Sequence, residues 1–259
     1  MPELCEVETF KRYLDKSSLK QLIKDIKVND ERILKVDYKF LKNSVVNRQF
    51  VSSTRHGKYL FVWLDPKFLV MHFGMTGDLQ YYNVKSPEPR FSKVIFHFNN
   101  NYNLSYISTR MFGKLDIANS IEDFIKKKHL GPDAYKMSFE EFTGALKRRT
   151  AILKNALLNQ SFIAGVGNIY SDEILFRTKL HPRKKLNDLT ENQVNELFTN
   201  IKEVLGYGIK MKGDFSTYPS DYLIPHRKKE ERCPTCDTEI ERYDISGRRG
   251  WFCRTCQKI

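Results

Sequence analysis

The sequence predicts an α+β protein of several domains, with an N-terminal β-sandwich that begins with a helix, a helical domain, and a C-terminal β-hairpin that carries cysteines. Three observations predict this class. Residues 26–117 alternate apolar and polar side chains, the chain after Ala118 spaces its apolar residues as helices do, and four of five cysteines form two CxxC pairs. We expect domains at 1–120, 121–228 and 229–259.

The first predicted element is a short amphipathic helix over residues 3–15. Its apolar side chains, spaced by three and four residues, are Leu4, Val7, Phe10 and Leu14. Pro2 stands where the first turn of a helix tolerates proline.

The segments KYLFVWL, FLVMHFGM, VIFHF and LSYIS predict the strands. Val94, Phe96 and Phe98 show the two-residue period of a half-buried strand, and Asp-Pro, Asn-Asn and Gly turns separate the segments. Short strands in this arrangement indicate a sandwich or a barrel.

Helices are predicted after Ala118. One apolar stripe consists of Leu146, Leu153 and Leu157. Thr190 and Gln193 have the spacing of a capping box that opens a further helix. The polar, basic stretch 211–232 then predicts a loop and linker.

The segment SFIAGVGNIY lies between two of these helices. Gly165 and Gly167 interrupt the helical period, and Asn168 is suited to cap a helix that runs to Leu180. The segment therefore predicts a helix, tight turns and a second helix.

Charge and apolar content limit the class of partner. The chain has 44 Lys and Arg against 31 Asp and Glu, a formal net charge of +13, which favours a polyanion but does not by itself select nucleic acid. No apolar run approaches the ~20 residues of a membrane span, and the first residues are acidic where a signal peptide is basic. We expect a soluble cytoplasmic protein without a signal peptide or membrane contact.

The cysteine pairs predict one metal site. Sixteen residues separate Cys233-Pro-Thr-Cys236 from Cys253-Arg-Thr-Cys256, as in two knuckles that converge four thiolates on a tetrahedral zinc ion. Four thiolates leave no open position, so we expect structural zinc; the alternative is four reduced cysteines without metal. Cys5 is left as a lone thiol.

Residues near both ends of the chain are suited to chemistry or to anion binding. Removal of the initiator methionine would leave Pro2 as a free secondary amine, and an α-amino group titrates near ~8, so a neutral nucleophile is available at physiological pH. Glu3 and Glu6 could transfer protons, or only complement the helix dipole. Arg248 and Arg249, at the predicted hairpin tip, could reach phosphates or form a solvated basic turn.

Six motifs in order, MPELCEVE, HGKYL, HFGMTG, TRMFG, IAGVGNIYSDEILF and the CxxC pairs, resemble the formamidopyrimidine-DNA glycosylase and endonuclease VIII family over essentially the whole chain. The resemblance implies a base-excision-repair DNA glycosylase with AP-lyase activity that acts on damaged double-stranded DNA. It implies structural zinc and no nucleotide or redox cofactor. The sequence gives no reason to expect an oligomer, so we expect a monomer, associated with the nucleoid when it is bound to DNA.

The resemblance also assigns residues. Pro2 matches the nucleophile, Glu3 the acid that assists sugar opening, Glu6 a supporting carboxylate, and Lys58 a phosphate-binding lysine that aids catalysis. The side chains that match the DNA-binding residues of the family are Met75, Arg110, Phe112, Lys154, Asn168 and Arg248. Met75, Arg110 and Phe112 match the wedge that replaces a base flipped out of the duplex. Met75 and Phe112 would otherwise be expected in the core, but their positions beside Gly74 and Gly113 favour loop tips.

Three departures from the family pattern bear on activity. Cys5 replaces a proline, which loosens the turn that aims the amine. Thr109 and Met111 stand beside Arg110 where the family usually has a proline and an arginine, which predicts weaker contacts under the wedge loop. The loop that closes over 8-oxoguanine is not recognisable in residues 206–227, so lesion preference stays open.

The separated wedge favours the formamidopyrimidine branch, and with it oxidised purines such as 8-oxoguanine and formamidopyrimidines, removed with β,δ-elimination. The alternatives are the same mechanism with a preference for oxidised pyrimidines or abasic sites, a non-catalytic lesion-binding protein, and a zinc-ribbon RNA-binding protein. The last explains only the charge and the CxxC pairs.

Overall fold

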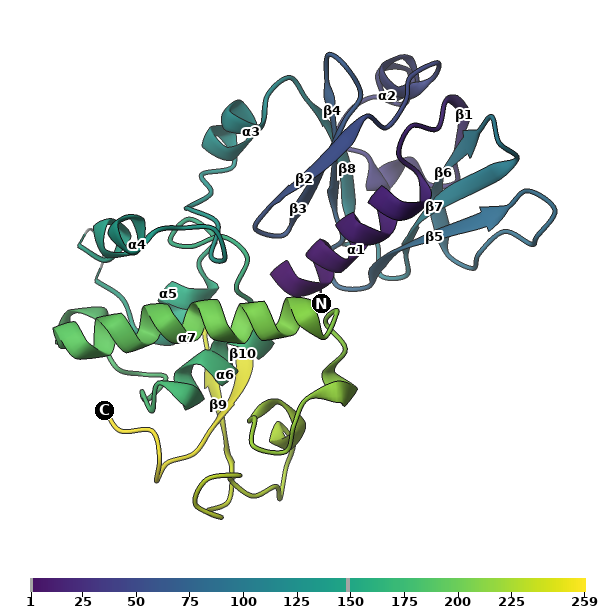
Figure 1. Ribbon diagram of the computed structural model, residues 1–259. Helices are drawn as coiled ribbons and strands as arrows, with labels where there is room; N and C mark the ends of the chain where they lie inside the picture. The colour runs from purple at the N-terminus through teal and green to yellow at the C-terminus, as the bar shows by residue number, and fades with distance from the viewer. Residues whose placement is uncertain (1, 148–149) are drawn as a thin grey trace. The chain divides into compact units, whose positions relative to one another are not determined.

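The computed structural model describes residues 2–147 and 150–259, which form two compact units, residues 1–128 and 129–259 (Figure 1). Each unit is described by itself. Within the described residues, no helix has both the length and the apolar character needed to cross a membrane.

The first unit is a β-sandwich with a helix at its start, as predicted. Helix α1 spans Leu4–Ser17. One antiparallel sheet has the order β1-β6-β7-β5, with bounds Ile23–Val28, Ser92–Phe98, Tyr102–Ser108 and Gly77–Asn83. The other has the order β2-β3-β4-β8, with bounds Ser52–His56, Tyr59–Trp63, Phe68–His72 and Lys114–Ala118.

One apolar cluster joins α1 to both sheets. Val7 and Leu14 of α1 are fully buried in it, together with Phe96 of β6 and Leu60 of β3. The predicted apolar face of residues 3–15 therefore covers the sandwich core, because burial of that face removes apolar surface from water.

Two short helices of this unit were not distinguished in the sequence. Helix α2 (Tyr38–Val45) lies in the region that the sequence predicts as strands, and α3 (Ile121–Lys127) follows β8. The Asp37 carboxylate accepts hydrogen bonds from the Lys39 and Phe40 amides at 2.8 and 3.2 Å and caps α2. A capped helix of eight residues gives too few periodic positions to be told from a strand.

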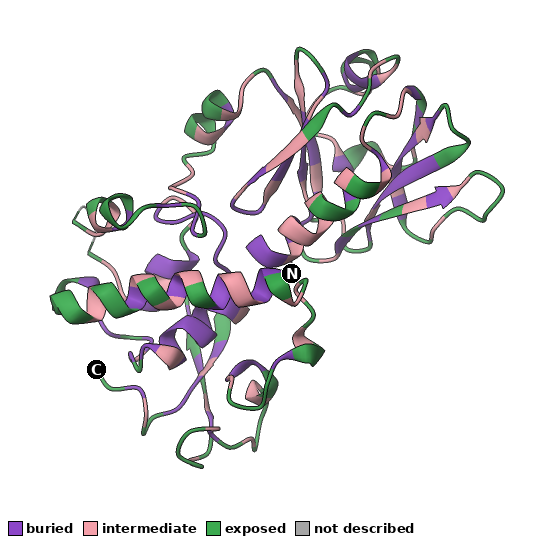
Figure 2. Cartoon of the chain, in the orientation of Figure 1, coloured by how far each residue is buried: buried purple, intermediate pink, exposed green. Residues whose placement is uncertain are grey.

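The second unit is helical and ends in a hairpin. Its helices are α4 (Phe139–Leu146), α5 (Leu153–Leu158), α6 (Asn168–Arg177) and α7 (Glu191–Lys210), and its strands are β9 (Glu241–Ile245) and β10 (Arg248–Phe252). The predicted Thr190–Gln193 capping box opens α7. Figure 2 shows α6 almost wholly buried, in agreement with its packing against α5, α7 and β10.

Two predictions for this unit were wrong in detail. Leu146 does not share a helix with Leu153 and Leu157, because α4 ends before α5 begins. Gly167, not Asn168, is the N-cap of α6, and that helix ends at Arg177. Asn168 is therefore the first residue of the helix, and its side chain makes a hydrogen bond outside that helix, to the Arg249 carbonyl.

Candidate active site and nucleic-acid interface

The N-terminal residues are held by a reciprocal cap at the start of α1. Glu3 is the N-cap residue, and its amide donates to Glu6 Oε2 at 2.6 Å, while the Glu3 side chain accepts from the Glu6 amide. The side chain of Glu3 is buried and Pro2 is half-buried. Helix capping therefore fixes both carboxylates beside Pro2. Cys5 is buried in the first turn of an intact helix, so the missing proline has not disrupted α1.

Lys58 lies in the tight turn between β2 and β3, where Gly57 has a φ of +55°. The turn is tied to α1 through Arg55. The buried Arg55 guanidinium donates from Nε to Glu8 Oε2 at 3.1 Å, and from Nη1 to the Gly57 carbonyl at 3.0 Å. Because Glu8 belongs to α1, this arginine links the helix capped by Glu3 to the turn that carries Lys58, whose side chain is buried.

His72, at the end of β4, is a neutral imidazole. Burial, with the positive charges of Lys58 and Lys128, lowers the pKa of His72 to about 4. Its Nδ1 accepts a hydrogen bond from the Gly74 amide at 3.3 Å. Neutral His72 thus supports the turn that carries Met75.

The predicted wedge residues lie on two turns that touch. Met75 is 39% exposed and Phe112 is 55% exposed. A Cβ on Gly74 would lie 2.3 Å from the Phe112 carbonyl carbon, and the Arg110 amide donates to Thr76 Oγ1 at 3.1 Å. The structure therefore brings Met75, Arg110 and Phe112 together at the surface, in agreement with their predicted place at loop tips.

Met111 supports this surface from below. It has a φ of +60°, and its side chain packs against the sandwich core. The sequence predicts weaker contacts under the wedge loop where Met111 replaces an arginine. The structure shows an apolar contact between Met111 and the sandwich core.

Lys154 is buried in the second unit, and its ammonium group bonds to α6. Its Nζ donates to the Asn168 carbonyl at 3.0 Å, to Ser171 Oγ at 2.7 Å and to Asp172 Oδ1 at 2.5 Å. With 1% of its surface exposed, Lys154 holds the first turn of α6 and presents no exposed charge in this structure.

Asp172 connects four elements of the same unit. Besides Lys154, it accepts from Arg227 Nη2 at 2.7 Å, from the Tyr243 hydroxyl of β9 at 2.7 Å and from the Trp251 amide of β10 at 3.1 Å. Burial and the neighbouring carboxylate raise the pKa of Tyr243 above its ordinary value. Asp172 therefore fixes the hairpin against α6.

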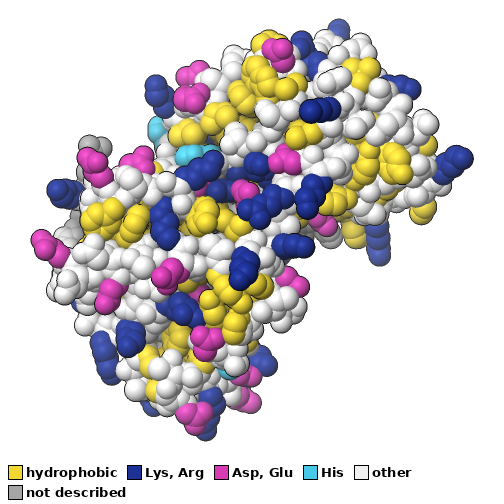
Figure 3. Space-filling view, in the orientation of Figure 1, with side chains coloured by type: hydrophobic (Ala, Val, Ile, Leu, Met, Phe, Trp, Pro, Cys, Tyr) yellow, Lys and Arg dark blue, Asp and Glu magenta, His cyan; other side chains and the backbone are white. Residues whose placement is uncertain are grey.

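The hairpin tip contacts the start of α6. Asn168 Nδ2 donates to the Arg249 carbonyl at 2.7 Å. Ser246 and Gly247 form the turn with positive φ, and the exposed Arg248 opens β10 directly after it. The predicted tip position of Arg248 and Arg249 is confirmed, and Asn168 lies beside them. Figure 3 shows further Lys and Arg side chains on the visible face of each unit.

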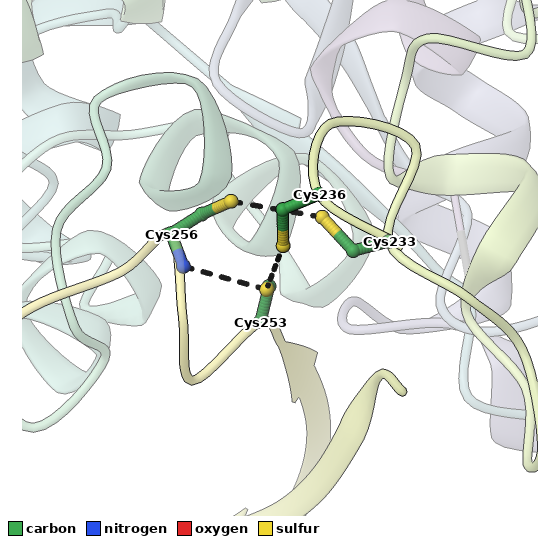
Figure 4. Close-up of side chains that lie close together, drawn as sticks. All are labelled: Cys233, Cys236, Cys253 and Cys256. Atoms are coloured by element: carbon green, nitrogen blue, oxygen red, sulfur yellow. Dashed lines mark hydrogen bonds between the residues drawn. The ribbon is translucent and has the colours of Figure 1, made fainter. Parts of the chain in front are cut away.

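The four cysteines converge on one point, as Figure 4 shows. Their sulfur atoms all lie within 4.8 Å of one another, with Cys233 to Cys256 at 3.7 Å and Cys236 to Cys253 at 3.5 Å. Ligands of a tetrahedral ion at the usual Zn–S length are about 3.8 Å apart. Four convergent sulfurs at this spacing fit a metal ion.

Residues 206–227 fold against α6. Tyr207 stacks on Tyr222 with ring centroids 4.9 Å apart, and the Arg177 guanidinium lies 3.8 Å from the Tyr222 ring centroid. The buried Glu173 carboxylate accepts from the Ile224 amide at 2.9 Å. The segment that lacks the recognisable lesion loop is thus anchored by aromatic and polar contacts.

The sequence did not predict a role for Arg55, Asp172, Arg227 or Tyr243. Asp172 lies four residues after Asn168 in the segment GNIYSDE, so helical spacing places both on one face. This spacing could have identified Asp172. Nothing local marks Arg227 or Tyr243, whose partner is distant in the chain.

Comparison with known proteins decides the family. A model of the formamidopyrimidine-DNA glycosylase N-terminal domain matches residues 1–115, and a model of the formamidopyrimidine-DNA glycosylase H2TH domain matches residues 130–220. The chain belongs to the formamidopyrimidine-DNA glycosylase family. Among its relatives are formamidopyrimidine-DNA glycosylases of Mycoplasma mobile, 32% identical with both chains covered completely, and of Oceanobacillus iheyensis, 34% identical with 99% of this chain and 98% of the relative covered.

Solved structures of formamidopyrimidine-DNA glycosylases have the same fold. The Lactococcus lactis protein in complex with DNA containing FAPY-dG superimposes with a TM-score of 0.91 at 29% identity, over 99% of this chain and 100% of that one. The same protein in complex with DNA containing an abasic site gives a TM-score of 0.90, with the same identity and coverage. Both structures contain the Lactococcus lactis protein, once with DNA containing FAPY-dG and once with DNA containing an abasic site.

Proposed function

We propose that this protein is a DNA glycosylase of base excision repair that is also an AP lyase, with the processed Pro2 amine as nucleophile. The observation that carries the proposal is the start of α1, where the capping box holds buried Glu3 beside Pro2. A positioned carboxylic acid next to a secondary amine suits displacement at a sugar carbon.

The reaction follows from this pair of groups. The Pro2 nitrogen attacks C1′ of the damaged nucleotide, the bond to the base breaks, and Glu3 protonates the sugar oxygen as the ring opens. The resulting iminium ion acidifies the C2′ proton, whose loss expels the 3′ phosphate in β-elimination. A δ-elimination then expels the 5′ phosphate and leaves a gap. Lys58 would bind the phosphate beside the lesion, and Glu6 would support Glu3.

The remaining predicted residues would hold the duplex. Met75, Arg110 and Phe112 form one exposed surface suited to fill the place of a flipped base. Asn168 and Arg248, at the N-terminus of α6 and on the hairpin, would bind phosphate. Lys154 would act through Asn168, since its ammonium group is bonded to the carbonyl of that residue.

We assign the cysteine cluster to one structural zinc ion bound by Cys233, Cys236, Cys253 and Cys256. The sulfur spacing agrees with a tetrahedral site, and four thiolates leave no position for a reacting water. The ion would hold the hairpin that bears Arg248. No nucleotide or redox cofactor enters this mechanism, and the protein would work as a monomer at the nucleoid.

We propose oxidised purines as preferred lesions, since the wedge surface matches the formamidopyrimidine branch. Because the loop that closes over 8-oxoguanine is not recognisable in residues 206–227, oxidised pyrimidines and abasic sites stay as alternative substrates. A non-catalytic lesion-binding protein is disfavoured, because Pro2, Glu3 and Lys58 are all retained and α1 is intact around Cys5.

Borohydride trapping of the methionine-processed protein tests the proposal. The duplexes would carry 8-oxoguanine, a formamidopyrimidine, an oxidised pyrimidine or an abasic site. A covalent adduct mapped to Pro2 on a base lesion supports the glycosylase/lyase and ranks its substrates. Trapping only at abasic sites would show a lyase without glycosylase activity. No trapping on any duplex would favour the non-catalytic lesion-binding protein.

The Pro2→Gly variant separates chemistry from binding. We expect it to weaken or reroute trapping while duplex binding is largely kept, because only the nucleophile changes. Equal loss of both would contradict a purely chemical role for Pro2.

A further inference from the structure

Three turns of the first unit meet at one end of the sheet β1-β6-β7-β5. Gly77 at the start of β5 pairs with Ser108 at the end of β7, and Ser92 at the start of β6 pairs with Ile107. The turns before β5, after β7 and before β6 are therefore neighbours. Two carry the wedge residues, and the third carries Arg90 and Phe91.

Phe91 is exposed beside the wedge surface. Its side chain is 41% exposed, and its carbonyl accepts a hydrogen bond from the Ser108 amide at 3.2 Å, two residues before Arg110. The Arg90 guanidinium lies 4.6 Å from the Phe91 ring centroid. The wedge has the same kind of pair, with the Arg110 guanidinium 5.5 Å from the Phe112 ring centroid. Two exposed Arg–Phe pairs thus lie at one end of the sandwich.

The backbone at Phe91 carries a second sign of function. Its φ is +64°, in the left-handed region that a bulky aromatic residue rarely adopts. Asn or Gly would adopt this conformation with less strain, and either would expose less apolar surface. Strain retained at an exposed side chain points to a use for that side chain.

We propose that Arg90 and Phe91 form a second DNA contact beside the wedge, in which the Phe91 ring stacks on a base or sugar and the Arg90 guanidinium binds a phosphate. This inference rests on the proposed function of the chain. Duplex DNA is the occupant that the surface fits, because an aromatic face under a guanidinium group suits nucleotides, and the chain is strongly basic.

Phe40 provides a matched control. It is an exposed phenylalanine of the same unit, 43% exposed, and the Lys67 ammonium lies 4.5 Å from its ring centroid. Lys67 precedes Phe68, which pairs with Ala118 at the far end of β8, whereas the wedge loop enters β8 at Lys114. Phe40→Ala therefore removes a similar aromatic pair away from the proposed contact.

The test measures the Kd of the full, methionine-processed protein for a duplex with a tetrahydrofuran abasic analogue, by fluorescence anisotropy. Phe91→Ala should weaken binding about tenfold, and Phe40→Ala by no more than about twofold. Phe91→Asn should weaken binding equally while its unfolding temperature stays at or above that of the wild type, because Asn relieves the left-handed backbone. If Phe91 had only a structural role, the Phe91→Asn variant would not lose affinity for DNA while keeping its unfolding temperature.

The outcomes separate this inference from the proposed function. If the wild type binds the tetrahydrofuran duplex and is trapped by borohydride on the lesion duplexes, but both Phe91 variants bind as tightly as it does, the second contact is refuted and the glycosylase proposal stands. If the wild type itself neither binds nor is trapped, the proposed function fails first. If Phe40→Ala weakened duplex binding as much as Phe91→Ala does, a DNA contact confined to Arg90 and Phe91 would also be refuted.

Discussion

The Lys154 ammonium and the Asp172 carboxylate form a buried ion pair, with 2.5 Å between Nζ and Oδ1 and both side chains almost fully excluded from solvent. Arg227 Nη2 approaches the other carboxylate oxygen at 2.7 Å. One carboxylate thus balances two cations. Removal of one partner from a buried pair leaves an uncompensated charge in a poorly solvated place.

We predict that Asp172→Asn lowers the free energy of unfolding by about 3–5 kcal/mol, because it leaves both cations unpaired. Lys154→Met should cost less, since Asp172 keeps Arg227, Tyr243 and Trp251 as partners. Urea denaturation in zinc-containing buffer measures both. Asp221→Asn is the control, because Asp221 is exposed and its pair with Arg177 is 3.3 Å long. If Asp172→Asn and Lys154→Met lowered the free energy of unfolding equally, Asp172 would not be compensating the charges of both Lys154 and Arg227.

A second prediction concerns the alignment of Lys58. Arg55→Met should slow single-turnover base excision by about ten- to a hundredfold with duplex Kd nearly unchanged, because the Lys58 turn loses its tie to α1. Arg12 provides the control: it also pairs with Glu8 at 3.1 Å, but it is exposed and does not contact the turn. Arg12→Met should leave the rate within about twofold. If Arg55→Met weakened duplex binding as much as it slowed base excision, Arg55 would not act by aligning Lys58.

Local patterns predicted those parts of the fold that depend on local contacts. The apolar spacing of Leu4, Val7 and Leu14 predicts α1, and the Thr190–Gln193 pair predicts the start of α7. In both cases neighbouring residues provide the stabilising contacts. The end of α4 before Leu153 was missed, since a helical stripe does not show where the backbone leaves the helix.

The candidate site was predictable where a motif holds its own residues together. Four cysteines at fixed spacing predict their own convergence, and turn glycines place Met75 and Phe112 at loop tips. Asp172 illustrates the opposite case. Its partners Arg227 and Tyr243 are 55 and 71 residues away, so their contact exists only once the unit has folded.

A third prediction is a pH dependence from His72. The pKa of His72 in the folded protein is about 4, below the ordinary value of 6.5, so the unfolded chain binds more protons between these values. Its contribution to stability is complete above pH 6.5 and declines as the pH falls through 4, by about 3 kcal/mol in total. Protonation would also remove the acceptor for the Gly74 amide.

The comparison of wild type with His72→Gln isolates this effect. Burial raises the pKa of Glu173 to about 7, which makes stability fall as the pH rises from about 4.5 to 7 and so opposes the effect of His72. Glu173 is unchanged in both proteins. The difference in unfolding free energy between them, measured from pH 4 to 7 by urea denaturation, should therefore grow with pH. A constant difference would contradict a neutral His72.

The last prediction separates the metal-binding cysteines from the lone thiol. Cys253 is fully buried and packs with Phe176 and Leu223 beneath the hairpin. Cys253→Ser should release zinc and weaken duplex binding about ten- to a hundredfold, because the hairpin that bears Arg248 and contacts Asn168 loses its anchor.

Cys5→Ser is the matched control, since Cys5 is equally buried but belongs to α1. Metal content by mass spectrometry and duplex Kd by anisotropy should both stay at wild-type values in this variant. If Cys253→Ser lost zinc but bound the duplex with unchanged affinity, the hairpin would have no part in DNA binding. Zinc retained by Cys253→Ser but lost by Cys5→Ser would overturn the metal site itself, because it would place a ligand outside the cluster of four sulfurs.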